Sequence, residues 1–182
     1  YDTFSNQVLL VSVTADGNGG NAASQEPSIS GNGASVAFAS AATNFATAAN
    51  GRVQIYVRDI PSGITKAASV VVGDTVNPGD ADSAAPSISA DGLMVAYASE
   101  ASNLVAGDTN GLSDIYTFVI SSGVLTRRTV GVDGALPNGP STEPAINGDG
   151  TVIAFTSAAS NLVDGDGNGV ADVFTVATTG GI

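Results

Sequence analysis

The chain has 182 residues, no cysteine and no histidine, and its 17 acidic and 5 basic residues give a formal net charge of −12. This charge opposes contact with phosphate backbones and anionic lipid surfaces, so we expect neither a nucleic-acid nor a membrane partner. Because the commonest general base and the commonest low-pKa nucleophile are missing, we predict that the protein is not an enzyme.

The chain opens with one apolar run, Gln7 to Val13, that stands apart from the rest of the sequence. We interpret residues 1–26 as a single strand and a linker. The sequence starts at Tyr1 rather than at methionine, which indicates a processed protein or a piece of a longer one, and no run of apolar residues is long enough to span a bilayer.

Three copies of one block come next, beginning at Pro27, Pro86 and Pro144, which are 59 and 58 residues apart. In each copy a short apolar run leads through an Asn-Gly or Asp-Gly pair into a second run that ends in an aromatic residue and a serine. A polar loop, a third run with an aromatic residue and a glycine turn come after it. Fourth runs, Thr65 to Val72 and Leu125 to Val132, complete the first two copies. Such turn pairs between apolar runs indicate β-hairpins.

A period of about 58 residues marks a repeat architecture. We therefore predict an all-β fold of β-propeller blades, each with four antiparallel strands, in a single domain over residues 1–182. The repeats cover residues 27–85, 86–143 and 144–182, and the third lacks its fourth strand. Val8 is aligned with Ile64, Val124 and Ile182, so the strand at the front is a permuted fourth strand.

The loop after the second run of the third copy has the spacing of a calcium loop. It reads Asp164-Gly165-Asp166-Gly167-Asn168-Gly169-Val170-Ala171-Asp172. Oxygen side chains stand at positions 1, 3, 5 and 9, glycine stands at position 6, and position 7 offers a carbonyl, as in the first part of an EF-hand. Position 12 is Thr175 rather than glutamate. We predict that Ca²⁺ is bound here by Asp164, Asp166, Asn168, Val170 and Asp172.

The second copy carries a weaker form of this loop, with Ala106 at position 1. Its predicted calcium ligands are Asp108, Asn110, Leu112 and Asp114. In the first copy Ala48 and Gln54 replace the two aspartates, so no metal is expected there. Asp, Asn and Gly are also the commonest turn formers, and a plain loop whose side chains bind their own backbone is the alternative.

Other polar residues recur at fixed places in the repeats, and we expect them to brace strand ends and loops rather than to bind a ligand. They are Ser24, Ser83, Ser141, Ser40, Ser99, Ser157, Asn44, Asn103 and Asn161. The cations Lys66, Arg127 and Arg128 fall on fourth strands, where we expect solvated charges.

The segment from Pro86 to Tyr116 resembles the WD40-like (TolB-type) β-propeller repeats of secreted bacterial proteins. The resemblance is most specific at Ser102-Asn103-Leu104-Val105 and Asp108-Thr109-Asn110-Gly111, which return as Ser160 to Val163 and Asp166 to Gly169. It implies four-stranded blades, an extracellular or periplasmic location and a binding or scaffolding role. The first copy departs from the pattern at Thr43-Asn44-Phe45-Ala46.

Three blades are too few to close a propeller comfortably, so we expect a partner for the open edge. Our leading hypothesis is a secreted, calcium-binding structural protein that assembles by strand complementation, with Gln7 to Val13 as donor and the strand around Val173 to Val176 as acceptor. Two chains in a six-bladed ring, a head-to-tail filament and a fragment of a longer chain are the alternatives left open. A propeller module that binds a glycan or a peptide is the competing function.

Overall fold

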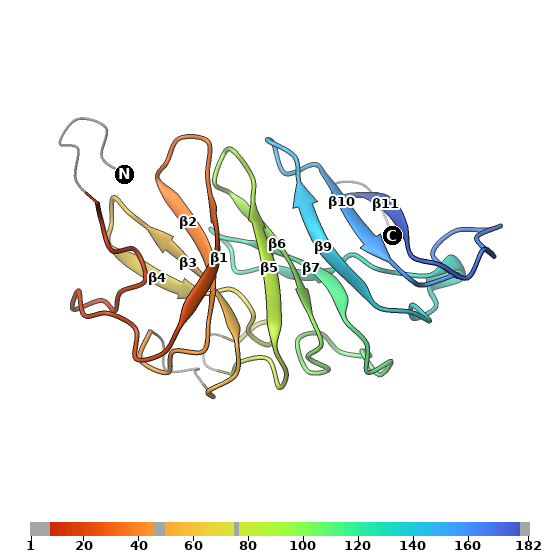
Figure 1. Ribbon diagram of the computed structural model, residues 1–182, viewed down its shortest axis with the longest axis horizontal. Coiled ribbons are helices and arrows are strands. Elements are labelled where there is room, and N and C mark those ends of the chain that lie inside the picture. Colours follow the sequence, from red (N-terminus) through yellow and green to blue (C-terminus); the bar gives the residue numbers. More distant parts are fainter. Residues whose placement is uncertain (1–7, 46–49, 75–76, 179–182) are drawn as a thin grey trace.

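The computed structural model describes residues 8–45, 50–74 and 77–178, which form three antiparallel sheets (Figure 1). Each of the first two sheets has four strands and the third has three, in the order in which the chain makes them. The strands are β1 (Ser24–Ile29), β2 (Ser35–Ser40), β3 (Gln54–Asp59), β4 (Ile64–Ala67), β5 (Ser83–Ile88), β6 (Met94–Ser99), β7 (Asp114–Val119), β8 (Leu125–Arg127), β9 (Ser141–Ile146), β10 (Val152–Ser157) and β11 (Asp172–Ala177). A short 3-10 turn, η1, spans Val132–Gly134.

This architecture confirms an all-β chain of antiparallel sheets. The first strand of each sheet begins three residues before the proline that marks the predicted repeat, at Ser24, Ser83 and Ser141. Equivalent strands pair in the same register, so that Phe38 lies opposite Tyr56, Tyr97 opposite Tyr116, and Phe155 opposite Phe174. The turn pairs close hairpins because their glycines take positive φ, as at Gly33 (69°). None of the described residues forms a helix long and apolar enough to cross a membrane.

The fourth strands are shorter than predicted, and β4 and β8 end at Ala67 and Arg127. Two residues beyond each of these strands, a side-chain hydroxyl accepts a backbone N–H of the third strand. The N–H of Ile55 donates to Ser69 Oγ at 2.9 Å, and the N–H of Ile115 donates to Thr129 Oγ1 at 3.1 Å. The strand therefore ends two residues before this hydroxyl while the chain stays attached to its neighbour.

Neighbouring sheets pack small residues against aromatic ones. Ala37 and Ala39 of the first sheet lie in one core cluster with Tyr97 and Tyr116 of the second. In the same way Ala96, Ala98 and Ile115 of the second sheet pack on Phe155 of the third, with Phe174 partly buried beside it. Small residues on one face let the bulky face of the next sheet approach, and the paired rings stack at 5.8 and 5.9 Å between centroids.

The first strand of each sheet lies beside the first strand of the next, so the sheets stand side by side in chain order (Figure 1). Ser28 Oγ accepts the N–H of Ile88 at 3.1 Å, and Ser87 Oγ accepts the N–H of Ile146 at the same distance. Backbone bonds between the turns, from Gly31 N to the carbonyl of Ala90 at 2.8 Å and from Asp91 N to that of Gly148 at 3.1 Å, also join neighbouring sheets. This side-by-side stacking of antiparallel sheets through their first strands agrees with the predicted propeller blades.

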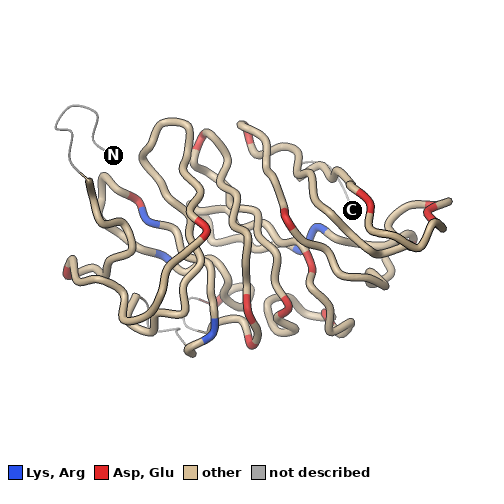
Figure 2. The backbone as a smooth tube through the Cα atoms, in the orientation of Figure 1, with Lys and Arg blue, Asp and Glu red and all other residues tan. Residues whose placement is uncertain are grey.

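Charges lie mostly at loops and strand ends, with acidic positions on all three sheets (Figure 2). One expectation about the few cations is wrong. Arg127 is not solvated, because only 14% of its side chain is exposed beside the buried Asp108. Arg128 donates from Nε to Thr117 Oγ1 at 2.8 Å, and burial lowers the pKa of its guanidinium. Lys66 reaches the carbonyl of Ile120 at 3.4 Å in an exposed contact.

Candidate functional site

Two regions carry the residues singled out by sequence: the polar loops between second and third strands, and the two ends of the row of sheets. Each recurring serine pair joins the start of a first strand to the end of a second. The paired Oγ atoms lie 3.0 Å apart in Ser24–Ser40 and 2.9 Å apart in Ser83–Ser99 and Ser141–Ser157. The recurring asparagines brace the linkers in the same way, as when Asn103 Nδ2 donates to the carbonyl of Pro78 at 3.0 Å. The bracing role predicted for both sets is confirmed.

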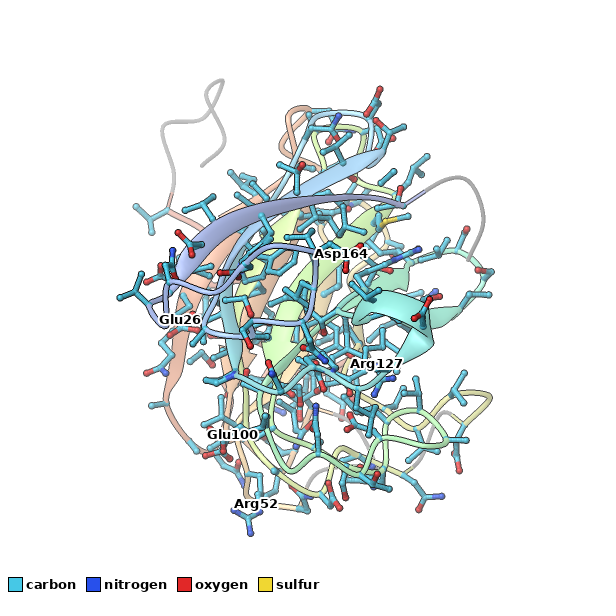
Figure 3. The ribbon with its side chains drawn as sticks, turned by 90° about the vertical axis from the view of Figure 1, so that its right-hand side faces the viewer. Glu26, Arg52, Glu100, Arg127 and Asp164 are labelled. Atoms are coloured by element: carbon cyan, nitrogen blue, oxygen red, sulfur yellow. The ribbon has the colours of Figure 1, made fainter. Side chains whose placement is uncertain are left out.

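The loop of the third repeat brings four of its predicted ligands around one open concavity. Asp164, Asp166, Asn168 and Asp172 line it together with Phe174. Figure 3 labels Asp164 on this loop between β10 and β11.

Hydrogen bonds inside this loop already use two of the side chains. Asn168 Oδ1 accepts the N–H of Val170 at 3.0 Å, and Asn168 Nδ2 donates to Asp172 Oδ2 at 2.7 Å. The bond to Val170 spans two residues and is the self-bracing turn that the plain-loop alternative predicts.

In the equivalent loop of the second repeat the two aspartates, Asp108 and Asp114, are buried, and Asp114 makes one more hydrogen bond than Asp172 does. Asn110 Nδ2 donates to Asp114 Oδ2 at 3.0 Å, and Asn110 Oδ1 accepts the N–H of Leu112 at 3.0 Å. Asp114 Oδ1 accepts the hydroxyl of Thr129 at 2.6 Å. Burial raises the pKa of Asp114, against the opposing effect of its bonds from Thr129 and Asn110.

Asp108 faces inward rather than toward the loop. It accepts the hydroxyl of Tyr116 and lies 3.7 Å from Arg127 Nη1. Burial, with Asp108 beside the hydroxyl, raises the pKa of Tyr116 far above the ordinary tyrosine value. Within residues 8–45, 50–74 and 77–178 no three acidic side chains come together closely enough to hold a metal ion. Calcium binding at either loop stays a prediction.

In the first repeat, Gln54 occupies the position of Asp114 and Asp172. Its Oε1 accepts the hydroxyl of Ser69 at 2.5 Å, as Asp114 Oδ1 accepts the hydroxyl of Thr129. The first repeat therefore makes the same bond with an amide in place of a carboxylate. Ala46 to Ala49 of this loop lie outside the described residues.

The apolar run at the front is not a strand between Val8 and Ser12, and Val13 makes one isolated bridge, to Gly19. Gln7 lies outside the described residues. In the first two sheets the fourth strand pairs with a third strand, as β4 pairs with β3. Among the described residues no strand pairs with residues 8–12 in this way. The segment instead packs on the first sheet, where Val11 contacts the core cluster of Phe38 and Tyr56.

The backbone around Ser12 repeats the backbone around Ser69. Gly20 N donates to the carbonyl of Ser12 at 3.1 Å, as Gly79 N donates to that of Ser69 at 3.0 Å. Ser12, Ser69 and Thr129 are therefore equivalent, which makes Val8 equivalent to Thr65 rather than to Ile64 as the alignment assumed. The linker after Ser69 is two residues longer than the one after Ser12, so counting residues along the chain does not align this segment correctly.

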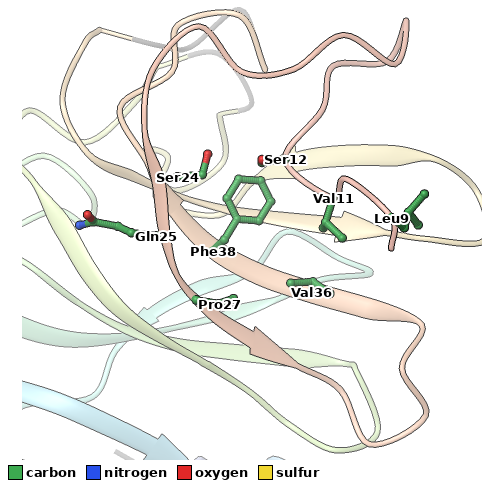
Figure 4. Close-up of a pocket in the computed structure, with 8 residues that line it drawn as sticks. All are labelled: Leu9, Val11, Ser12, Ser24, Gln25, Pro27, Val36 and Phe38. Carbon is green, nitrogen blue, oxygen red and sulfur yellow. The ribbon is translucent and has the colours of Figure 1, made fainter. Parts of the chain in front are cut away.

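A pocket of about 180 Å³ lies between this segment and the first sheet (Figure 4). It is lined by Leu9, Val11, Ser12, Ser24, Gln25, Pro27, Val36 and Phe38. Val8 is 93% exposed and Leu10 is 61% exposed. The aromatic residues beneath this segment are buried, with Phe38 4% and Tyr56 1% exposed, so this end of the molecule presents the apolar side chains of the segment itself.

The opposite end presents the small-residue face of the third sheet. Val173 on β11 is 76% exposed, whereas Ile55 and Ile115, which hold the equivalent place in β3 and β7, are completely buried. Among the described residues no strand pairs with the outer edge of β11. The sequence predicts this edge as an acceptor, and that stays a prediction. It does not single out Ser12, whose equivalence to Ser69 follows from the turn Asn18 to Asn21, which matches Asn77 to Asp80.

No family model and no curated protein matches the chain. Among solved structures it is similar to TolB from Acinetobacter baumannii (20% identity, 87% of this chain and 33% of that one, TM-score 0.45) and to the tricorn protease (17% identity, 79% and 11%, TM-score 0.50). It is also similar to the β-propeller domain of the trilobed protease from Pyrococcus furiosus (14% identity, 74% and 34%, TM-score 0.46). The chain spans a third or less of the first two. These similarities concern the fold alone.

Proposed function

We propose that this chain is a structural β-propeller module that self-assembles head to tail outside the cytoplasm and does not catalyse a reaction. The observation that carries the proposal is the exposure of Val173, at a position that is completely buried in the other two sheets. A sheet face of this kind is covered by the aromatic face of the next blade wherever a next blade is described.

Both ends of the molecule expose apolar side chains. One end offers Val173 with the small residues Ala154 and Thr156 beside it, and the other offers Val8, Leu9 and Leu10, which lie in front of the buried Phe38. Because the two surfaces differ, their contact is head to tail, and it closes into a ring or extends as a filament according to the rotation between copies.

Calcium belongs to the proposal as a stabiliser of the third-repeat loop. Asp164 and Asp166 line the concavity beside β11, so a bound ion would hold the loop next to the acceptor edge. The negative charge of the chain supports this role, because a divalent cation would reduce repulsion between copies.

The test is the mass of the full chain by light scattering, with and without Ca²⁺, and its shape by electron microscopy. We expect oligomers or fibres for the natural chain and monomers for Val173→Asp, because a carboxylate would be buried without a partner. Val124→Asp is the matched control, since Val124 is 52% exposed in the turn between β7 and β8. A monomeric natural chain, or equal effects of the two substitutions, would contradict the proposal.

A further inference from the structure

We propose that residues 8–12 of one copy form the missing fourth strand on β11 of a second copy, with the hydroxyl of Ser12 bonded to the carboxylate of Asp172. This inference rests on the proposed head-to-tail assembly and specifies its register. The occupant of the open edge is thus a defined segment of the same protein.

The two complete sheets show what this junction requires. Ser69 Oγ donates to Gln54 Oε1 at 2.5 Å and Thr129 Oγ1 donates to Asp114 Oδ1 at 2.6 Å. The same hydroxyls accept the N–H of the following residue, Ile55 or Ile115. A hydroxyl after the fourth strand therefore fastens the first two residues of the third strand in both sheets.

The third sheet has the receiving half of this junction. Asp172 Oδ2 accepts Asn168 Nδ2 at 2.7 Å, as Asp114 Oδ2 accepts Asn110 Nδ2 at 3.0 Å. In the second sheet the other oxygen, Oδ1, takes the threonine hydroxyl. Within the described part of the chain no hydroxyl from a fourth strand stands beside Asp172.

Ser12 supplies the donating half. Its backbone carbonyl is held by Gly20 as that of Ser69 is held by Gly79, so the hydroxyl leaves the chain at the equivalent point of the linker. Among the described residues no strand pairs with the segment that contains Ser12. The two halves of the junction lie at opposite ends of one molecule, and a second copy brings them together.

The complete sheets also fix which residues face one another. Because Tyr56 pairs with Ala67 and Tyr116 with Arg127, Leu10 lies opposite Phe174 of the second copy. Leu9 then lies opposite Thr175, and Val8 opposite Val176. Val8 and Leu10, 93% and 61% exposed in the single chain, would be covered along with Val173.

Single-cysteine variants test this register directly, because the natural chain has no cysteine. We would mix Leu9→Cys chains with Thr175→Cys chains under mild oxidation and measure disulfide-linked dimers on a denaturing gel. The control mixture is Leu10→Cys with Thr175→Cys. The alignment of Val8 with Ile64 predicts crosslinking for the control instead, since a slip of one residue sends every side chain to the other face of the sheet.

We expect the Leu9–Thr175 mixture to crosslink at least tenfold faster than the control. A faster control, or no crosslink in either mixture while the chains still assemble, would overturn the register and leave the proposed assembly intact. Monomeric chains would overturn both.

The hydroxyl is tested separately by Ser12→Ala and Ser12→Thr. Loss of one hydrogen bond to a carboxylate should weaken self-association about tenfold, and threonine, which makes the equivalent bond at position 129, should restore it. Equal association by the alanine, threonine and natural chains would show that Ser12 takes no part.

Discussion

Arg127 lies 3.7 Å from Asp108 in the interior of the second sheet, and its Nε and Nη1 atoms make no hydrogen bond. Asp108 also accepts the hydroxyl of Tyr116, so one carboxylate serves both groups. A buried ion pair with incomplete hydrogen bonding contributes little net stability, although breaking it on one side is costly.

Asp108→Ala should therefore lower the free energy of unfolding by about 3 kcal/mol, because Arg127 is left buried without a counter-charge. The double variant Asp108→Ala, Arg127→Ala should recover much of this loss. The first repeat already has alanine at both equivalent positions, Ala48 and Ala67. Urea denaturation of the three chains measures the coupling, and a double variant no more stable than the single one would refute it.

Ser99→Ala should lower the free energy of unfolding by about 1–3 kcal/mol, since it leaves the buried hydroxyl of Ser83 and the N–H of Ala101 without their shared partner. Glu100→Ala, one residue along and exposed, is the control and should change stability by less than about 0.5 kcal/mol. Thermal unfolding followed by circular dichroism separates the two, and equal melting temperatures would contradict the bracing role.

Gly139→Ala should destabilise the chain by about 1–3 kcal/mol. A Cβ atom there would lie 2.5 Å from the carbonyl carbon of Ala158, so the backbone after β10 would have to move. At Gly148 the nearest atom to an added Cβ is Ala90 Cβ at 3.6 Å, an ordinary contact, and Gly148→Ala should be close to neutral. Calorimetry of both variants distinguishes close approach from a general cost of replacing glycine.

Acid should weaken the linker at Asp80. Burial opposes its ionisation, but hydrogen bonds from the Ser102 side chain and backbone prevail and lower its pKa. A carboxylate whose pKa is lower in the folded chain adds stability above its unfolded pKa, about 3.9, and loses it as the pH falls through the folded value.

Asp80→Asn should remove this dependence, because Asn21 and Asn138 make equivalent bonds in the other repeats. The difference in unfolding free energy between the two chains should stay constant above about pH 5 and shift in favour of asparagine below about pH 4. Asn138→Asp is the reciprocal control and should introduce the same acid sensitivity. If the unfolding free energies of the natural chain and of Asp80→Asn changed equally from pH 3 to 7, the stabilising role of the Asp80 carboxylate would be contradicted.

The strands were predictable because each repeat presents the same local signals. Turn pairs such as Asn32-Gly33, alternating apolar residues and paired serines appear three times, and each needs only its neighbours to act. The burial of Arg127 was not predictable from its strand. It depends on Asp108, which precedes β7 and turns inward across the sheet.

The place of Ser12 was missed for another reason. Equivalence within a repeat follows hydrogen bonds, whereas a sequence period follows residue counts, and the linker after Ser69 is two residues longer than its counterpart after Ser12. The calcium loops show a third limit. Turn-forming and metal-binding patterns use the same residues, so the spacing of Asn168 and Asp172 fits both roles.

The first strand of every sheet contains a residue with positive φ just before its proline: Glu26 at 53°, Ala85 at 51° and Glu143 at 54°. Each of these strands has a break in its pairing at this point. Bends and charged residues on an edge strand discourage another chain from adding to it. At high concentration, other copies of this protein should therefore add poorly to the edges formed by β1, β5 and β9. A concentrated solution should form ordered assemblies in preference to amorphous precipitate.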